Sequence, residues 1–308
     1  MWNGALVVLP LGIVMVVGWW LRRFQVLSSK GVEEMNRTLY WVVLPAILFR
    51  ATVTVDPIHF TNFAFMAALY GPFLILPVFA WGLARLRGFP RERLAVSVLV
   101  SVRGNNVFLG LPVITVALGE AGLVWYAVYM ALALVVYQLI SIVSVQIALS
   151  GSVSLRTLTG ALKKLMINPL VLACVAGVIG AFIGFRLPSW LDQSLCILGH
   201  TGSGVALVGL GASLKLGNLL SSLGRVWNDL LVRLILSPLL TWGALSLFSL
   251  DPMLVRTSVL MAAMPAAVDN FVLAQGMGMD HEAAGEIIVA STVWFVATTA
   301  FWLYLLGL

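Results

Sequence analysis

Long apolar runs recur from one end of the chain to the other, and they constrain the fold more than any other feature. Most are about as long as a helix must be to cross the hydrocarbon core of a bilayer. Of the 308 residues, 61% are hydrophobic and only 10% are charged, and the mean hydropathy is +1.04. Soluble globular domains do not have this composition. The sequence therefore predicts an all-α polytopic membrane protein.

Polar breaks divide the chain into ten apolar segments, each of which we expect to span the membrane. The segments lie at about residues 4–21, 37–55, 60–84, 93–118, 122–148, 165–184, 190–213, 227–248, 253–278 and 284–307. No basic stretch precedes the first segment and no clear small-residue cleavage site follows it, so we interpret it as a span rather than a signal peptide. Cys174 and Cys196 lie within segments and fit no metal-ligand spacing, which favours a role in packing.

Basic residues gather in alternate connections between the segments. Four connections and their flanks hold most of the 18 Lys and Arg residues: Arg22, Arg23, Lys30, Arg37, Arg85, Arg87, Arg91, Arg93, Arg156, Lys163, Lys164, Lys215 and Arg225. The positive-inside rule places these connections in the cytoplasm and both termini on the other side of the cell (inner or plasma) membrane. The net charge of +6 is therefore a topology signal and does not indicate nucleic-acid binding.

Ten segments with both termini on one side divide into two sets of five, which must have opposite orientations. We predict a first repeat at residues 1–148, a cytoplasmic connecting loop at residues 149–164, and a second, inverted repeat at residues 165–308. One constant offset supports this division. It aligns NNVFL (105–109) with DNFVL (269–273), LPAIL (44–48) with VGLGA (208–212), and Asn36 with His200.

The fourth and ninth segments are both interrupted near their middle. The fourth contains RGNNVFLGLP (103–112) and the ninth contains MPAAVDNFVLAQG (264–276). Glycine and proline weaken a helix, and such breaks persist in lipid only where they are buried in protein or line a watery cavity. Paired breaks in inverted repeats indicate a transport site. We expect the two helices to cross near the bilayer midplane, where the half-helices offer N–H groups to an anion and carbonyl groups to a cation.

The two breaks carry Arg103 and Asp269, and a charge at the bilayer centre costs at least ~2.5–3.5 kcal/mol. Two interpretations are open. The pair could be a structural ion pair, or Arg103 could bind a substrate carboxylate while Asp269 handles a proton or Na⁺. Asn105, Asn106 and Asn270 add amides that can bind either a carboxylate or a cation.

Other polar residues in the apolar segments have simpler expected roles. His200 lies in GHTGSG (199–204), whose small residues favour close helix packing. Arg233 follows Asp229 by one helical turn, which predicts a local structural pair near the cytoplasmic face. Glu286 begins the tenth segment and is expected to be solvated. The chain has no HExxH motif and no DxxD-type acidic cluster, so we expect no metal site and no enzyme activity.

The stretches GNNVFLGLP (104–112) and PAAVDNFVLA (265–274) resemble the auxin efflux carrier family, in its prokaryotic branch of malonate- and malate-type transporters. LPAILF (44–49) and INPLVLACVAGVIG (167–180) add to the resemblance, which runs over the whole chain. It implies two inverted five-helix repeats with helices 4 and 9 broken and crossed, an architecture shared with bile-acid symporters. It also implies a scaffold of helices 1, 2, 6 and 7 and a transport domain of helices 3–5 and 8–10 that moves in the manner of an elevator.

The resemblance also assigns individual residues. Plant members have a Pro-Asn pair where Gly104 and Asn105 stand, so Asn105 is carried over as substrate-binding. Pro265 matches the first proline of their helix 9, and Asn270 stands at the second. Asp269 is an added acid relative to plant carriers, which are thought to need no coupling ion, and it favours coupling here.

Together these features predict a secondary active transporter of a small organic anion such as malonate or malate, without a cofactor. The predicted substrate-binding residues are Arg103, Gly104, Asn105, Asn106, Pro265 and Asn270. Asp269 would couple H⁺ or Na⁺, and Asn36 and His200 are candidate contacts on the scaffold side. The alternatives are a bile-acid-type Na⁺ symporter of a larger apolar anion and an uncoupled, auxin-like anion carrier. The predicted partners are the anion, the lipid bilayer and a second copy of the chain in a homodimer.

Overall fold

The computed structural model describes residues 2–152, 154–214 and 219–308, and the regular elements in those residues are all helices. Lys215, one of the basic residues used for the topology prediction, lies outside them. The first helices are α1 (Trp2–Arg23), α2 (Ser29–Thr38), α3 (Leu44–Val53), α4 (Phe63–Leu86), α5 (Arg91–Val102), α6 (Gly110–Ser150) and α7 (Leu155–Met166). The later helices are α8 (Pro169–Phe182), α9 (Ser189–Ser213), α10 (Leu219–Leu230), α11 (Ser237–Leu245), α12 (Pro252–Ala262), α13 (Asn270–Gly276) and α14 (His281–Leu305). Two π-helices and one 3-10 helix join some of them: η1 (Leu39–Val43), η3 (Leu231–Leu236) and η2 (Pro57–Thr61).

Within the described residues, α4, α6, α9 and α14 are each long and apolar enough to cross a membrane. Residues Leu158–Met166 and Pro169–Phe182 make a further candidate if they count as one span bent by 64°. Other predicted segments are divided: η1 and η3 interrupt the second and eighth, and non-helical stretches break the fourth and ninth. The all-helical membrane class is confirmed, whereas the number of ten spans stays a prediction.

Glycine sets the boundary between the fourth and fifth predicted segments. Both run into α6, but Gly119 within it has φ 62° and ψ −155°, a conformation that residues with a Cβ rarely adopt. The chain therefore turns at this point.

The predicted connecting loop at residues 149–164 is largely helical, because it contains most of α7. Ser154 begins this helix, and its Oγ accepts a hydrogen bond from the backbone N–H of Arg156 at 3.2 Å. The next helix, α8, begins with the Asn-Pro pair noted in the sequence. Asn168 Oδ1 accepts from the backbone N–H of Leu170 at 2.9 Å, and Pro169 occupies the first turn, where no N–H is needed.

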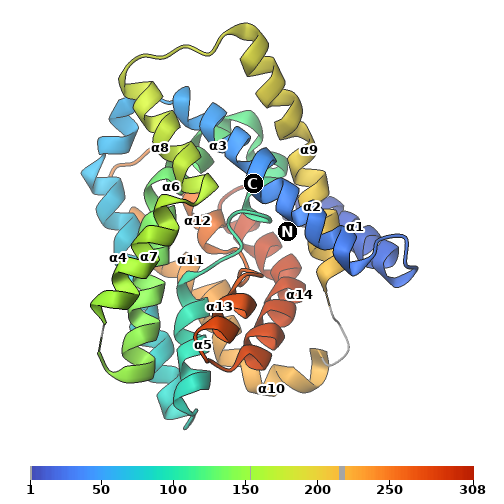
Figure 1. Ribbon diagram of the computed structural model, residues 1–308, viewed down its shortest axis with the longest axis vertical. Helices are drawn as coiled ribbons and strands as arrows, with labels where there is room; N and C mark the ends of the chain where they lie inside the picture. Colours follow the sequence, from blue (N-terminus) through green and yellow to red (C-terminus); the bar gives the residue numbers. More distant parts are fainter. Residues whose placement is uncertain (1, 153, 215–218) are drawn as a thin grey trace.

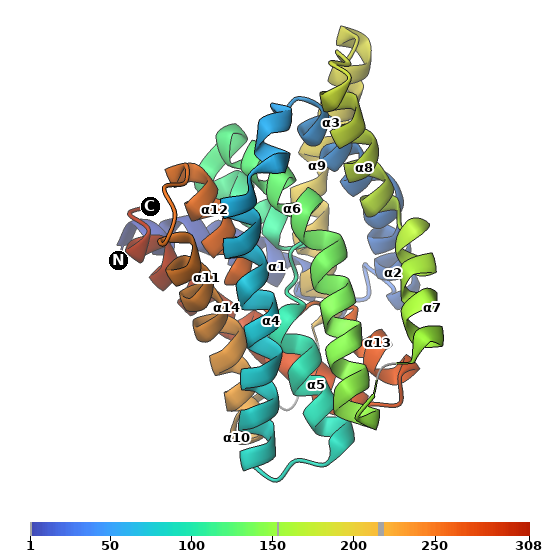
Figure 2. The same cartoon turned by 90° about the vertical axis from the view of Figure 1, so that its left-hand side faces the viewer.

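The helices pack in two groups. α1 lies along α9 and α3 lies along α8, while α4, α5 and α6 pack with one another and with members of the set α10–α14. Figure 2 shows α2, α3 and α8 on one side of α6 and α11, α12 and α14 on the other. Both views place the beginning of α1 close to the end of α14, with which it packs (Figures 1 and 2).

The outer faces of several helices expose large apolar side chains, as expected of a surface that contacts lipid. On α1, α4 and α8 these are Leu9, Ile13, Val16, Leu74, Val78, Phe79, Leu172, Ile179 and Phe182. The interior is filled by aromatic residues from α4, α6 and α14, among them Phe65, Tyr126 and Trp302. Trp302 donates its Nε1–H to the carbonyl O of Leu234 at 2.9 Å and so ties α14 to the wide turn of η3.

Candidate functional site

Two non-helical stretches contact each other inside the protein. Residues 103–109 separate α5 from α6, and residues 263–269 separate α12 from α13. Gly104 and Ala266 pair as an antiparallel bridge. Two main-chain hydrogen bonds flank the bridge, from Asn105 N to Pro265 O (2.7 Å) and from Ala267 N to Arg103 O (3.0 Å). Each broken helix thus supplies partners to polar backbone groups that the other leaves unpaired.

Arg103 is held from three sides at this bridge. Its Nε donates to Oδ1 of Asn270 at 3.0 Å, its Nη1 donates to Oε1 of Gln138 at 2.6 Å, and its Nη2 pairs with the carboxylate of Asp269. Asn270 also donates its Nδ2–H to the carbonyl O of Arg103 at 3.1 Å. The side chain of Arg103 is 6% exposed and that of Asp269 is 59% exposed. The arginine is therefore fixed, whereas its carboxylate partner remains open.

A cavity of about 240 Å³ lies beside this ion pair. It is lined by Tyr40, Arg103, Gly104, Asn105, Val107, Phe108, Leu134, Tyr137, Gln138, Asn168, Leu170, Ala267, Val268 and Asp269. Tyr40 belongs to η1 and Leu170 to α8, whereas Arg103 and Asp269 belong to the two breaks. The cavity therefore lies between the two groups of helices.

Asn105 lines this cavity and has a buried, unpaired donor. The residue is 2% exposed, and its Oδ1 accepts from the backbone N–H of Phe108 at 3.2 Å. Its Nδ2 has no hydrogen-bond partner among the described residues. A buried donor without a partner costs ~1–3 kcal/mol, which makes Asn105 Nδ2 a candidate hydrogen-bond donor to a ligand in the cavity.

Two other predicted site residues belong to the breaks without lining the cavity. Asn106 is buried, and the hydroxyl of Tyr126 donates to its carbonyl O at 3.2 Å. Pro265 contributes its carbonyl to the bridge. Both residues shape the breaks around the cavity.

Asn36 and His200 also lie outside the cavity lining. Asn36 packs against α9, where its Oδ1 stands only 2.5 Å from the position that a Cβ on Gly209 would occupy. His200 is exposed on α9, and its Nε2 lies 3.3 Å from Sγ of Cys196. The structure therefore brings Arg103, Asn105 and Asp269 together and leaves these two residues apart.

Four polar residues of the cavity were not among the predicted site residues: Tyr40, Tyr137, Gln138 and Asn168. Gln138 offered a signal, because it is an isolated amide inside an apolar segment. Asn168 marks the beginning of α8, and its capping role gave no indication that it would face the breaks. Tyr40 is one of several aromatic residues in its segment and has no distinguishing pattern.

The predicted local pair of Arg233 and Asp229 is wrong. Arg233 is 2% exposed and donates to three main-chain carbonyls at the breaks: Nε to Met264 O (2.8 Å), Nη1 to Ser101 O (3.0 Å) and Nη2 to Ala262 O (2.9 Å). Its side chain leaves η3, whose wider turn replaces the regular helical spacing that the prediction assumed. Asp229 pairs with Arg93 instead.

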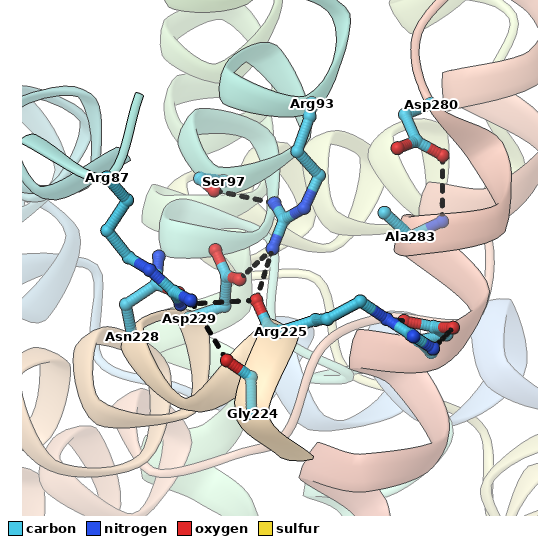
Figure 3. A network of polar contacts seen from close by, with 10 residues as sticks. Arg87, Arg93, Ser97, Gly224, Arg225, Asn228, Asp229, Asp280 and Ala283 are labelled. Carbon is cyan, nitrogen blue, oxygen red and sulfur yellow. Dashed lines mark hydrogen bonds and ion pairs between the residues drawn. The ribbon is translucent and has the colours of Figure 1, made fainter. Parts of the chain in front are cut away.

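Figure 3 shows the network around Arg93 and Asp229, at the beginning of α5. Arg93 was counted among the basic residues of a predicted cytoplasmic connection; it is 6% exposed, and its Nη1 donates to Oγ of Ser97 at 2.8 Å. Arg87 donates to Oδ1 of Asn228 at 2.8 Å in the same network. These contacts join the start of α5 to α10.

Glu286, which was expected to be solvated, is partly buried and accepts from Nε of Arg225 at 3.2 Å. The hydrogen bond to Glu286 and its negative charge raise the pKa of the Arg225 guanidinium. This contact joins α10 to α14, so the ends of three helices are tied together at one place.

A family model described as "Membrane transport protein" matches residues 6–303, almost the whole chain. The chain belongs to the auxin efflux carrier family. It is 26% identical over 305 residues to a Rhizobium meliloti protein named "Putative malonate transporter", covering 97% of this chain and 94% of that protein. It is 22% identical over 356 residues to auxin efflux carrier component 8 of Arabidopsis thaliana, covering 97% of this chain and 96% of that protein. It is 25% identical over 314 residues to an uncharacterized transporter of Methanocaldococcus jannaschii, covering 97% of this chain and 98% of that protein. The resemblance found in the motifs is confirmed, and this member of the family is a multi-pass membrane transporter.

Proposed function

We propose that the protein is a secondary active transporter of a small organic anion, a carboxylate such as malonate or malate. One observation carries the proposal: Arg103, Asp269 and the unpaired amide of Asn105 meet at a cavity between two groups of helices. A guanidinium that is already oriented and an amide that lacks an acceptor suit a carboxylate. The relative named as a malonate transporter supports this substrate class.

The proposed architecture is the family's: ten spans in two inverted repeats, residues 1–148 and 165–308, with the broken helices crossing. The scaffold would comprise helices 1, 2, 6 and 7, and the transport domain helices 3–5 and 8–10. The packing of α1 with α9 and of α3 with α8 supports such a scaffold, because α1, α3, α8 and α9 lie in the predicted helices 1, 2, 6 and 7. Movement of the transport domain past the scaffold would open the cavity alternately to the two sides. The basic connections would face the cytoplasm, with both termini outside the cell membrane.

In the proposed cycle, the substrate carboxylate competes with Asp269 for Nη2 of Arg103. Asp269 is open enough to be displaced, whereas Asn270 and Gln138 keep the guanidinium in place. Asn105 Nδ2 donates to the bound carboxylate. The displaced Asp269 then takes up a proton or another cation, because an uncompensated carboxylate in the membrane is unfavourable. Substrate binding and cation uptake would thus depend on each other.

A second candidate is a symporter of a larger apolar anion, of the bile-acid type. The aromatic and aliphatic side chains of the cavity wall, including Phe108, Leu134 and Tyr137, favour it. An uncoupled anion carrier is the third candidate, and Asp269 argues against it.

Uptake into proteoliposomes separates these candidates. Malonate and malate uptake would be measured under an imposed pH gradient and, separately, a Na⁺ gradient, with the Asp269→Asn variant alongside. The matched control is Asp192→Asn, because Asp192 also pairs with an arginine, Arg50, at 2.7 Å but lies outside the cavity lining. We expect one gradient to drive uptake, Asp269→Asn to abolish that dependence, and Asp192→Asn to preserve it. If folded protein moves neither acid under any gradient, the dicarboxylate assignment is wrong and larger apolar anions become the substrates to test.

A further inference from the structure

Arg233 occupies an unusual position for a buried arginine. Its guanidinium contacts the carbonyl groups at the ends of both helices that precede the breaks, Ser101 O of α5 and Ala262 O of α12, and also Met264 O just beyond α12. Among the ion pairs formed by the described residues, none includes Arg233. Its charge is therefore balanced by main-chain oxygen atoms.

The ends of these two half-helices need a positive group. The last four carbonyls of a helix have no partner within it, and the aligned peptide dipoles give this end a partial negative charge. In lipid no bulk water satisfies such carbonyls. Two helix ends that converge on one point therefore form an oxygen-rich position that suits either a metal cation or a planar donor such as guanidinium.

Neighbouring residues are shaped around the guanidinium. A Cβ on Gly104 would lie 2.5 Å from Nη2 and 2.9 Å from Cζ of Arg233, so only glycine leaves room for it. Ser237 Oγ adds a second donor to Ala262 O at 3.0 Å. Arg233 does not line the cavity, whose ion pair is formed by Arg103. The two arginines thus have separate positions at the breaks.

We propose that Arg233 is the resident cation of the breaks: it fills the place where the converging carbonyls would otherwise bind Na⁺. The position among these three carbonyls is therefore closed to metal cations. Na⁺ neither binds at this position nor drives transport by binding there. Only the uptake arm of the test below rests on the proposed transport function.

Thermal unfolding of the purified chain in detergent tests the proposal. NaCl would replace choline chloride at constant ionic strength, and methylguanidinium chloride at low millimolar concentration would be the second probe. We expect the melting temperature of the wild type to be unchanged by Na⁺. Arg233→Ala should melt lower and recover about 2 °C or more with Na⁺ or methylguanidinium, because a ligand of the native state raises the melting temperature.

Trp302→Phe is the matched control, since Trp302 is also buried and donates to a main-chain carbonyl but carries no charge. We expect neither cation to restore its melting temperature. A response of Trp302→Phe equal to that of Arg233→Ala, or no response of folded Arg233→Ala to either cation, would overturn the proposal. If Arg233→Ala does not fold, the wild-type protein still decides: a saturable rise of its melting temperature with Na⁺ contradicts a closed site.

Uptake gives an independent readout. We expect uptake by Asp269→Asn, which lacks the proposed coupling carboxylate, to change less than about 2-fold when Na⁺ replaces choline, and a several-fold stimulation of this variant would refute the inference. If no tested anion is transported at all, the proposed function fails while the unfolding measurements still decide the role of Arg233.

Discussion

At the scale of single residues, the polar groups around the cavity are of two kinds. Some hold Arg103 in place, and others remain available to a ligand. Asn270 and Gln138 fix the guanidinium, so we assign them positioning roles. Asn105 differs, because one end of its amide caps a backbone N–H while the other end has no partner among the described residues. Its Nδ2 is therefore the group whose removal should affect binding with little effect on folding.

The substitution Asn105→Asp tests that assignment, since it keeps the oxygen that accepts from Phe108 and removes the donor. A hydrogen bond to a charged group contributes about 1.5–3 kcal/mol, and the new carboxylate repels an anion. We expect kcat/KM for anion uptake by the folded variant to fall at least ~10-fold. Asn62→Asp is the control, because Asn62 Oδ1 caps α4 in the same way, at 3.0 Å from Phe65 N. Equal uptake by the two variants would contradict a role of Asn105 in binding.

The sequence predicted those site residues whose type is rare within apolar segments. Arg103 and Asp269 could be identified because charges inside apolar segments are expensive. Arg233 was assigned wrongly, because its spacing from Asp229 satisfies a local helical rule, whereas its actual partners are carbonyls about 30 or more residues away in either direction. Spacing along one helix carries no information on such distant partners.

At the scale of elements, the positions of the two breaks could be predicted from Gly, Pro and clustered polar residues. The π-helices η1 and η3 could not, because LYWVV and LVRLIL contain no glycine or proline and read as ordinary apolar helix. The direction of Arg233 depends on η3, so this missing element also explains the wrong pair. Most of α7 fell within the predicted connecting loop, because the segments were divided at polar breaks in the apolar runs and this stretch is such a break.

Close packing between the first break and η3 makes Gly104→Ala informative. The added methyl group would meet the guanidinium of Arg233, which three hydrogen bonds hold in place. Overpacking of this kind costs about 1–3 kcal/mol, so we expect the melting temperature to fall by several degrees. Gly71→Ala on α4 is the control, because no atom lies within 4 Å of its added Cβ, and it should have no effect or a slight stabilising one. An unchanged melting temperature in Gly104→Ala would show that Arg233 is not fixed.

The junction of α5 with α10 depends on a buried ion pair. Asp229→Asn removes the charge that balances Arg93 while keeping the side-chain shape, and both partners are nearly inaccessible. Breaking a buried pair from one side typically destabilises by about 3–5 kcal/mol. We expect a large drop in melting temperature, against a change of at most about 1 kcal/mol for Asp192→Asn, whose pair is partly exposed. Similar melting temperatures for the two variants would show that the network in Figure 3 contributes little to stability.

At the scale of the whole molecule, the charge of the moving site limits which cycles are feasible. A transport domain that carries its site through the membrane field does work of about 2.3 kcal/mol per elementary charge per 100 mV. Among the described lining residues, Arg103 and Asp269 are the groups that carry charge, and as an ion pair they sum to zero. The empty cavity therefore adds no net charge to the moving domain, and the charge of Arg233, which would move with that domain in both directions, cancels over a complete cycle.

The loaded site is also neutral if it holds one monoanion and a protonated Asp269. A dicarboxylate would then be carried as its singly protonated form, and a dianion would add net negative charge to the moving domain. We expect a potential of about 100 mV, imposed with K⁺ and valinomycin, to change the accumulation of the anion at steady state less than ~2-fold, whereas an inward proton gradient should change it several-fold. In Asp269→Asn the neutral amide cannot take up a proton, so the site loaded with a monoanion is neutral, the empty site carries the charge of Arg103, and the proton dependence should disappear. Uptake that follows the potential and ignores the pH gradient in the wild type would contradict this neutral cycle and favour transport of the fully ionised anion.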